Sequence, residues 1–203
     1  MGTNKLEQEA KFWLGDPAKL EQNLKSLGAH LVQPRTYELN LRFDTEDGRL
    51  AKAFQALRLR QDQKARLTFK GAADQASSVS SREEIEVEVS DLKTTREILE
   101  ALGYRVVVTY EKYRAAYQLG EVEVSLDEMP FGNFCEIEGP DTDAIRAAAE
   151  DLGLDWEARS KLSYLAIFGA LKEAYSLPID DLTFEAFKGL TLSMEKVGLV
   201  FAN

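Results

Sequence analysis

The residues in this sequence that could do chemistry are carboxylates and basic side chains that recur at every second position. Glu7, Glu9 and Lys11 have this spacing near the start of the chain, and Arg58 and Arg60 repeat it further on. The same spacing holds for Thr68 with Lys70, for Glu84, Glu86 and Glu88, for Lys112 with Arg114, for Glu121, Glu123 and Asp127, and for Glu136 with Glu138. Because successive side chains of a strand point to opposite faces, each group shares one face. Carboxylates are the oxygen ligands that Mg²⁺ or Mn²⁺ prefers, and Arg and Lys neutralise phosphate oxygens. The pattern therefore indicates a site for metal-bound oligophosphate.

A sheet with one wet face is the simplest alternative explanation, because antiparallel sheets often bury one face and expose the other. Two features favour an enclosed site. Several strands carry charges of a single sign, as Glu84, Glu86 and Glu88 do, whereas a face evolved only for solubility tends to mix Lys, Glu, Thr and Ser. Helices with apolar stripes also need a surface to cover, and the apolar strand faces supply it. If the sheet curls beneath those helices, the charged faces point inward.

Alternating and helical segments together predict an α+β fold. Strict apolar and polar alternation predicts eight strands, at residues 5–12, 37–44, 56–60, 66–70, 84–89, 106–117, 121–127 and 134–138. Helical spacing predicts helices at residues 17–27, 91–102, 141–152 and 159–175. The helices interrupt the strands without a regular βαβ rhythm, so the fold is α+β and not doubly wound. If the sheet curls beneath its helices, it forms an antiparallel β-barrel with the helices packed on its outside. Residues 71–81, which are small and polar, are expected to form a mobile loop at its entrance.

Length and composition limit the domains and partners. We expect residues 1–177 to form the tunnel domain and residues 178–203 to form a C-terminal helical appendage. The formal net charge of −10 would repel a nucleic-acid backbone, so we expect no such partner. One cysteine, Cys135, and one histidine, His30, are too few for an ordinary zinc site, so any metal must be held by oxygen. No apolar run approaches the roughly 18 residues of a membrane span. We therefore expect a cytoplasmic protein without a membrane contact, with a homodimer left open.

The charged motifs, in their order along the chain, carry a family resemblance. The first is the five-residue signature E-x-E-x-K at Glu7-Gln8-Glu9-Ala10-Lys11. The later motifs are Arg42-Phe43-Asp44-Thr45, Leu57-Arg58-Leu59-Arg60, Leu67-Thr68-Phe69-Lys70, Arg82-Glu83-Glu84-Ile85-Glu86, Glu111-Lys112-Tyr113-Arg114, Ser125-Leu126-Asp127, Gly132-Asn133-Phe134-Cys135-Glu136-Ile137-Glu138 and Lys161-Leu162-Ser163-Tyr164. Over residues 5 to 175 the sequence resembles the CYTH superfamily of triphosphate tunnel metalloenzymes, which includes class IV adenylyl cyclases, thiamine triphosphatases and inorganic triphosphatases.

The resemblance implies an eight-stranded antiparallel β-barrel tunnel with helices packed on its outside. It also implies roles for particular residues in a two-metal mechanism that uses Mg²⁺ or Mn²⁺. The implied metal ligands are Glu7, Glu9, Asp127, Glu136 and Glu138. The implied triphosphate-binding residues are Arg58, Arg60, Lys70, Lys112, Arg114 and Lys161. Lys11 and Glu9 would be catalytic, with Lys11 orienting the attacking group, and Glu84 and Glu86 could assist the second metal or fix the basic residues. Arg42 departs from the family pattern, in which many relatives carry an aromatic residue, so the non-phosphate end of the substrate stays open.

The activity that these roles predict is hydrolysis of a small-molecule triphosphate, with inorganic triphosphate as the leading substrate. One metal would neutralise the phosphoryl oxygens and the other would activate water for in-line attack. Three alternatives stay open. A class IV adenylyl cyclase would convert ATP to cyclic AMP and pyrophosphate, a thiamine triphosphatase would hydrolyse a different organic triphosphate, and a non-catalytic module would only bind polyphosphate.

Overall fold

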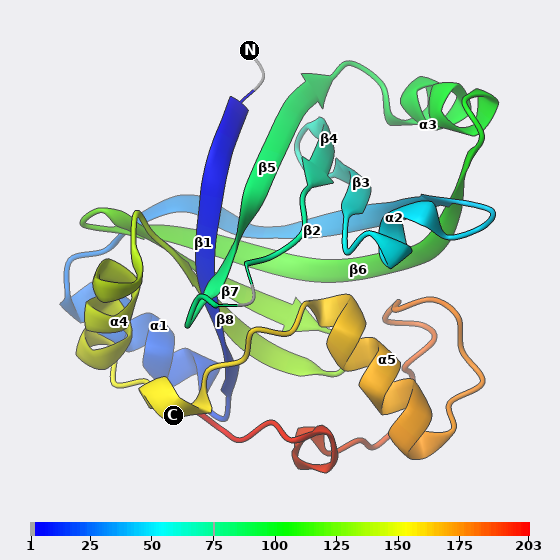
Figure 1. Cartoon of the computed structure of the whole chain (residues 1–203). Helices are drawn as coiled ribbons and strands as arrows, with labels where there is room; N and C mark the ends of the chain where they lie inside the picture. The colour runs from blue at the N-terminus through cyan, green and yellow to red at the C-terminus, as the bar shows by residue number, and fades with distance from the viewer. Residues whose placement is uncertain (1–2, 75) are drawn as a thin grey trace.

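The computed structural model describes residues 3–74 and 76–203, and over this part of the chain eight strands close into an antiparallel barrel (Figure 1). Residues 1–2 of the predicted domain and residue 75 of the predicted loop lie outside the described residues. The strands are β1 (Thr3–Leu14), β2 (His30–Thr45), β3 (Ala56–Gln61), β4 (Ala65–Lys70), β5 (Ser80–Val89), β6 (Tyr104–Leu119), β7 (Val122–Met129) and β8 (Gly132–Glu138). They follow one another around the barrel in the order β1-β5-β4-β3-β2-β6-β7-β8. The predicted fold class is confirmed.

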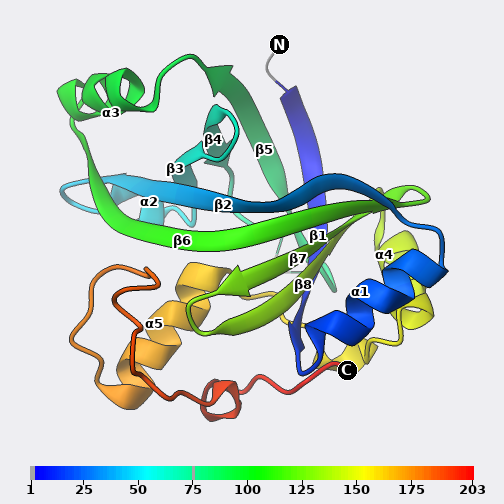
Figure 2. The ribbon, with the colours of Figure 1, turned by 180° about the vertical axis from the view of Figure 1, so that it is seen from behind.

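Helices and the C-terminal segment lie against much of the outside of the barrel (Figures 1 and 2), and apolar side chains of the strands pack against them. Helices α1 (Pro17–Ser26) and α4 (Thr142–Asp151) contribute to one core with β1, β7 and β8, in which Phe12, Leu24 and Ile137 are fully buried. A second core joins α5 (Tyr164–Tyr175) to the C-terminal segment, and a smaller third core lies beneath α3 (Leu92–Ala101). Because apolar burial drives folding, the alternate charged faces are left to line the interior. Among the described residues, no helix has the length and apolar character needed to cross a membrane.

Capping side chains set the helix boundaries, and they correct one prediction. The Asp16 carboxylate accepts a hydrogen bond of 2.9 Å from the Lys19 amide, which starts α1 where the sequence predicts it. The last predicted helix begins at Tyr164 and not at residue 159, because Ser163 caps it and Ser160 donates a backbone hydrogen bond of 2.7 Å to the Lys11 carbonyl. Residues 159–163 therefore run beside β1 and bring the start of α5 to the barrel. A short 3-10 helix, η1 (Trp156–Ala158), precedes them.

The C-terminal segment differs from the helical appendage that the sequence predicts. Within residues 178–203 the helical structure is a single four-residue 3-10 helix, η2 (Met194–Val197). Gly189 and Gly198 adopt φ values of +79° and +80°, which interrupt helical turns. Leu182 is fully buried and exchanges backbone hydrogen bonds of 2.9 Å with Thr109 and Glu111 of β6. The segment's apolar residues thus serve to cover α5 and the part of β6 that β7 does not reach.

A one-turn helix that the sequence analysis missed, α2 (Arg49–Lys52), lies between β2 and β3. Asp44 organises it, since its buried carboxylate accepts hydrogen bonds of 2.7–2.9 Å from the amides of Thr45, Leu50 and Ala51. The turn ends at Phe54, whose φ of +56° lies in the left-handed region. Glycine is preferred there, and another residue costs about 1–3 kcal/mol.

Replacing Asp44 by Asn is expected to lower the free energy of unfolding at pH 7 by about 2 kcal/mol, because a buried acceptor of three amides loses its charge. Burial raises the pKa of Asp44, but the three amides lower it more, so the native value lies below the ordinary one. The stabilisation should therefore be complete above the unfolded pKa of about 3.9 and be lost as the pH falls through the native value. Urea denaturation between neutral and acidic pH measures this dependence. Asp47→Asn, an exposed change in the same turn, is the control, and equal losses from both variants would contradict the assignment.

Candidate active site

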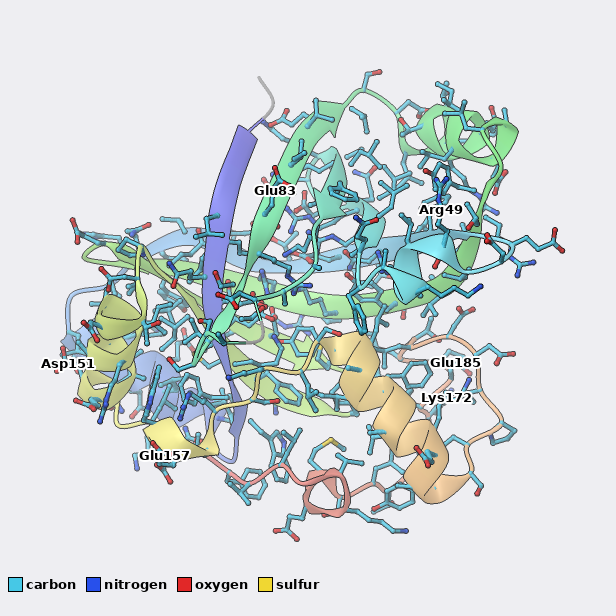
Figure 3. All side chains as sticks on the ribbon, in the orientation of Figure 1. Arg49, Glu83, Asp151, Glu157, Lys172 and Glu185 are labelled. Atoms are coloured by element: carbon cyan, nitrogen blue, oxygen red, sulfur yellow. The ribbon has the colours of Figure 1, made fainter. Side chains whose placement is uncertain are left out.

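The barrel encloses a cavity of about 770 Å³ whose lining is mostly charged. Among the described residues, nine of the lining side chains are basic and seven are acidic, although the whole chain carries a net charge of −10. The basic residues are Lys11, Arg42, Arg58, Arg60, Lys70, Arg82, Lys112, Arg114 and Lys161. The acidic residues are Glu7, Glu9, Glu84, Glu86, Glu123, Glu136 and Glu138. Other charged residues, such as Asp151, Glu157 and Glu185, lie on peripheral segments away from the barrel (Figure 3). The interior is therefore a distinct charged site.

The carboxylates of β1 and β8 form an acidic wall, and the arginines of β2 and β3 form a basic wall on the other side of the barrel. Glu7 and Glu9 lie on β1 and Glu136 and Glu138 on β8, and these strands are neighbours in which Glu9 is directly opposite Glu138. Arg58 and Arg60 lie on β3, which is four places around the ring from β8, and Arg42 lies opposite Arg58 on β2. Because both sets line the same cavity, the two walls face each other across it. This is the enclosed arrangement that the alternation of charges predicts.

Within the acidic wall, Lys11 is held between carboxylates. Its ammonium group forms an ion pair with Glu136 and lies 3.8 Å from the Glu9 carboxylate, and only 3% of the side chain is exposed. Burial lowers the pKa of Lys11, but Glu136 and Glu9 outweigh it, so the pKa lies above the ordinary value. Burial likewise raises the pKa of Glu136, but Lys11 and Arg114 hold it well below the usual range. Lys11 is thus a cation that can orient a group and cannot accept a proton.

Three arginines of the lumen, two on the basic wall and Arg82 on β5 beside β1, have donors without close partners. The Nε atoms of Arg58, Arg60 and Arg82 are buried and lack a hydrogen-bond partner among the described residues. Arg58 lies 4.0 Å from Glu86, Arg60 lies 3.6 Å from Asp62, and Arg82 lies 3.6 Å from Glu7, which are ion-pair contacts longer than hydrogen bonds. Burial and the neighbouring charge of Arg58 lower the pKa of Arg60. Buried donors without partners are costly, so this part of the lumen is suited to an anionic ligand that satisfies them.

Two other predicted phosphate-binding residues, Lys70 and Lys161, already have partners within the protein. The Lys70 ammonium lies 2.6 Å from Glu7 and 2.8 Å from Glu84. Burial raises the pKa of Glu84, and Lys70 lowers it below the ordinary value. Lys161, in the middle of the segment before α5, donates a hydrogen bond to the carbonyl of Ser77. It therefore joins the predicted entrance loop to the cavity lining.

Asp127 is the predicted ligand that the structure keeps apart from the others. Its side chain is fully buried, and it does not line the large cavity. It accepts hydrogen bonds from Arg114 at 2.6 Å, from Lys112 at 3.1 Å and from the Tyr164 hydroxyl at 2.7 Å. A direct metal contact would require those bonds to break. In the described structure Asp127 positions two cations and the first residue of α5.

Sequence reasoning assigned no role to four residues that belong to the interior: Glu38, Arg42, Arg82 and Tyr164. The alternation that revealed the other residues includes Arg82, which is two positions before Glu84, and Glu38, which is four positions before Arg42. Glu38 is 1% exposed and lies 3.7 Å from Lys112, and both of its oxygens lack hydrogen-bond partners among the described residues. Burial raises the pKa of Glu38, but Lys112 and the lumen arginines lower it below the ordinary value. It therefore adds negative charge behind the basic wall.

Fold and interior together define a class of protein, the closed antiparallel barrel whose charged lumen forms a tunnel. The CYTH domain model matches residues 5–166, and the chain belongs to the CYTH family. A protein of Methanocaldococcus jannaschii named "Putative adenylate cyclase MJ0240" is 32% identical over 135 residues, which cover 66% of this chain and 76% of the relative.

Two solved structures show the same fold. One, from Vibrio parahaemolyticus and described as "a putative adenylate cyclase", has a TM-score of 0.70 at 22% identity and covers 82% of this chain and 99% of its own. The other, "Putative adenylyl cyclase HpAC1 from Hippeastrum", is described as having a dominant triphosphatase activity. Its TM-score is 0.63 at 24% identity, with coverage of 81% of this chain and 95% of its own. The barrel fold is therefore shared with both proteins.

Proposed function

We propose that this protein catalyses the metal-dependent hydrolysis of a triphosphate, with inorganic triphosphate as the smallest substrate that satisfies the interior. The observation that carries the proposal is a set of buried Nε donors, of Arg58 and Arg60 on the basic wall and of Arg82 on β5, that lack hydrogen-bond partners among the described residues and line the same cavity as the carboxylates. Arginine forks match phosphate oxygens, and a chain of three phosphates can contact several of them at once. Membership of the CYTH family and the activity described for the Hippeastrum protein support the same chemistry.

The donor set fits a divalent cation such as Mg²⁺ or Mn²⁺. Glu9 and Glu138 are directly opposite on β1 and β8, and like charges in this position repel, so a divalent cation between them would add to the stabilisation that Lys11 and Arg82 give Glu9 from 3.8 Å. Among the described residues, no three His, Cys, Asp or Glu side chains converge as a ready metal cluster. Mg²⁺ does not need one, because it keeps several waters and binds one or two carboxylates together with substrate phosphate. Glu9 and Glu138 would hold the ion, with Glu7 and Glu136 beside them.

Each wall then has a part in the reaction. When bound, the divalent ion supplies charge neutralisation at the phosphoryl oxygens and a more acidic water. Arg58, Arg60 and Arg82 bind the phosphate oxygens that gain charge in the transition state. Lys11, which stays protonated, orients the attacking group beside Glu9. Closure of the barrel around these groups limits the water that reaches them.

The direct test is to incubate the purified protein with inorganic triphosphate and either Mg²⁺ or Mn²⁺ and to measure released phosphate. We expect turnover with the metal and its loss when EDTA is added. ATP and thiamine triphosphate are the companion substrates, which extend the assay to the organic triphosphates. No turnover of inorganic triphosphate with either ion would refute the proposal.

Adenylyl cyclase activity is the second candidate, and the name of the Methanocaldococcus jannaschii relative favours it. In that reaction the ribose 3′-hydroxyl of ATP would replace water as the nucleophile and pyrophosphate would leave. The same acidic and basic walls would bind ATP in this reaction, because the charges that develop on the phosphate are similar in cyclisation and in hydrolysis. Cyclic AMP and pyrophosphate from ATP, measured in the same incubations, distinguish cyclisation from hydrolysis.

A further inference from the structure

Glu38 is a buried carboxylate between two pairs of cations that line the cavity. It lies on β2, whose neighbours in the ring of strands are β3 and β6 (Figure 1). The cations on those neighbours are Arg58 and Arg60 on β3 and Lys112 and Arg114 on β6. Glu38 itself is 1% exposed and does not belong to the described lining of the cavity. The carboxylate therefore lies among these cations without opening onto the cavity.

The contacts of Glu38 are ion pairs without hydrogen bonds. One of its oxygens is 3.7 Å from the ammonium of Lys112, which is directly opposite on β6, and the other is 3.9 Å from the guanidinium of Arg60. Neither oxygen has a hydrogen-bond partner among the described residues. Burial raises the pKa of Glu38, but Lys112 and the other three cations lower it below the ordinary value, so the group is ionised at neutral pH. Glu38 thus attracts the cations without holding them in hydrogen bonds.

Asn40 lies two positions further along β2, on the same face as Glu38 and directly opposite Arg60. It is fully buried, and both the oxygen and the nitrogen of its amide lack hydrogen-bond partners among the described residues. Aspartate has nearly the same shape as asparagine, and Arg60 would favour its ionised form there. The position therefore allows a second negative charge to be added near the same cations.

Glu38 and a phosphate anion in the cavity attract the same cations. Charges a few ångströms apart interact strongly where the dielectric constant is low, and salt screens them little when they are buried. A negative charge behind the cations lowers the positive potential that they present to an anion. Removing that charge should strengthen anion binding, whereas removing a residue that only held the cations in place should weaken it. The sign of the change therefore distinguishes a counter-charge from a structural support.

We propose that Glu38 is a permanent counter-charge that limits how tightly the tunnel holds phosphate anions, so that pyrophosphate can leave after hydrolysis. The inference rests on the proposed function and adds to it a residue that sets affinity. Substrate and product share phosphate groups, so cations that bind triphosphate also retain pyrophosphate. Tight binding of both gives no acceleration of the chemical step. Glu38 does not touch the phosphates and acts through Lys112 and Arg60.

The test measures the binding of inorganic triphosphate and of pyrophosphate by calorimetry in EDTA, where no turnover is needed. Glu38→Gln removes the charge and keeps the shape, and it should bind both anions about tenfold more tightly than the wild type. Asn40→Asp adds a charge, and it should bind both about tenfold more weakly. With metal present, Glu38→Gln should also show a lower KM for triphosphate and stronger inhibition by pyrophosphate, whereas the loss of a support would raise KM.

Glu83→Gln is the matched control, because it makes the same change of charge at an exposed position of β5. Its affinities should stay within about twofold of the wild type. Equal or weaker binding by Glu38→Gln would overturn the inference, and so would tighter binding of the same size in the control. The melting temperature of the empty protein should fall in Glu38→Gln, because the cations lose their counter-charge, and triphosphate should raise it by more than in the wild type.

The two variants keep the inference separate from the proposed function. If Glu38→Gln does not fold, Asn40→Asp decides alone, and an affinity equal to or tighter than that of the wild type would overturn the inference. If the wild type binds triphosphate but does not hydrolyse it with either metal, the proposed function fails, while opposite shifts in the two variants still support the counter-charge. Failure of the wild type to bind either anion in EDTA would overturn the counter-charge, while hydrolysis with metal would still support the function.

Discussion

Glu9→Gln is expected to lower the turnover of inorganic triphosphate by about 10³-fold while the barrel stays folded. The Glu9 side chain is 13% exposed and lines the cavity opposite Glu138. Its nearest cations, Lys11 and Arg82, are each 3.8 Å away, beyond hydrogen-bond distance. The amide keeps the shape of the side chain and removes the charge that a divalent ion requires. The loss should therefore appear in kcat more than in thermal stability.

Glu83→Gln provides the matched control for this variant. Glu83 lies on β5, the other neighbour of β1, and its exposed side chain belongs to the strand face opposite to that of Glu84 (Figure 3). The same chemical change on the outside of the barrel should leave both turnover and melting temperature as in the wild type. The measurement is the rate of inorganic triphosphate hydrolysis by each variant with Mg²⁺ and with Mn²⁺. A Glu9→Gln protein as active as the Glu83→Gln protein would show that Glu9 has no part in the mechanism.

The sequence predicts which charged side chains share a strand face, because the alternation of side-chain direction along a strand depends only on local backbone geometry. Glu7 and Glu9 must share a face whatever their neighbours are, and so must Arg58 and Arg60. Helix starts were also predictable where the cap is adjacent, as at Asp16. The eight strands followed from the same local pattern. What alternation cannot provide is which faces meet, since that depends on pairing between distant strands.

The incorrect predictions also result from contacts between residues that are distant in the sequence. The start of α5 is shifted because Ser160 pairs with Lys11, a residue far away in the chain. The C-terminal segment is irregular because Leu182 pairs with β6, which its own neighbours in sequence do not indicate. Asp127 has the parity of Ser125, a residue of the cavity lining, yet it is enclosed by Arg114, Lys112 and Tyr164 and does not reach the cavity. Tertiary contacts override local preference in each case.

Opposed walls explain how a chain of net charge −10 can bind a polyanion. Its outer acidic residues lie on peripheral segments, whereas the described cavity lining contains more basic than acidic side chains. Between low-dielectric walls these charges are screened less than they would be on the surface. Each carboxylate near the lumen therefore affects its basic neighbours strongly, and Glu136 has the closest such contacts.

Replacing Glu136 by Gln is expected to lower the free energy of unfolding by about 3–5 kcal/mol, the scale for removal of one partner from a buried ion pair. Glu136 contacts both Lys11 and Arg114. Without it, Arg114 retains Asp127, but Lys11 retains only the 3.8 Å contact with Glu9 among the ion pairs of the described residues. Since Lys11 is 3% exposed, water compensates only in part for the lost carboxylate. Urea denaturation at neutral pH measures the loss.

The double variant Lys11→Met with Glu136→Gln separates this cause from a general packing defect. If the unpaired buried ammonium is what destabilises the single variant, removing it as well should recover part of the loss, giving a coupling of about 1–3 kcal/mol in the double-mutant cycle. Methionine keeps most of the length and apolar stem of lysine, so the cavity created is small. Destabilisations that simply add in the double variant would show that Lys11 and Glu136 do not stabilise one another, and the acidic wall would then have to be held by Arg114 and Asp127 alone.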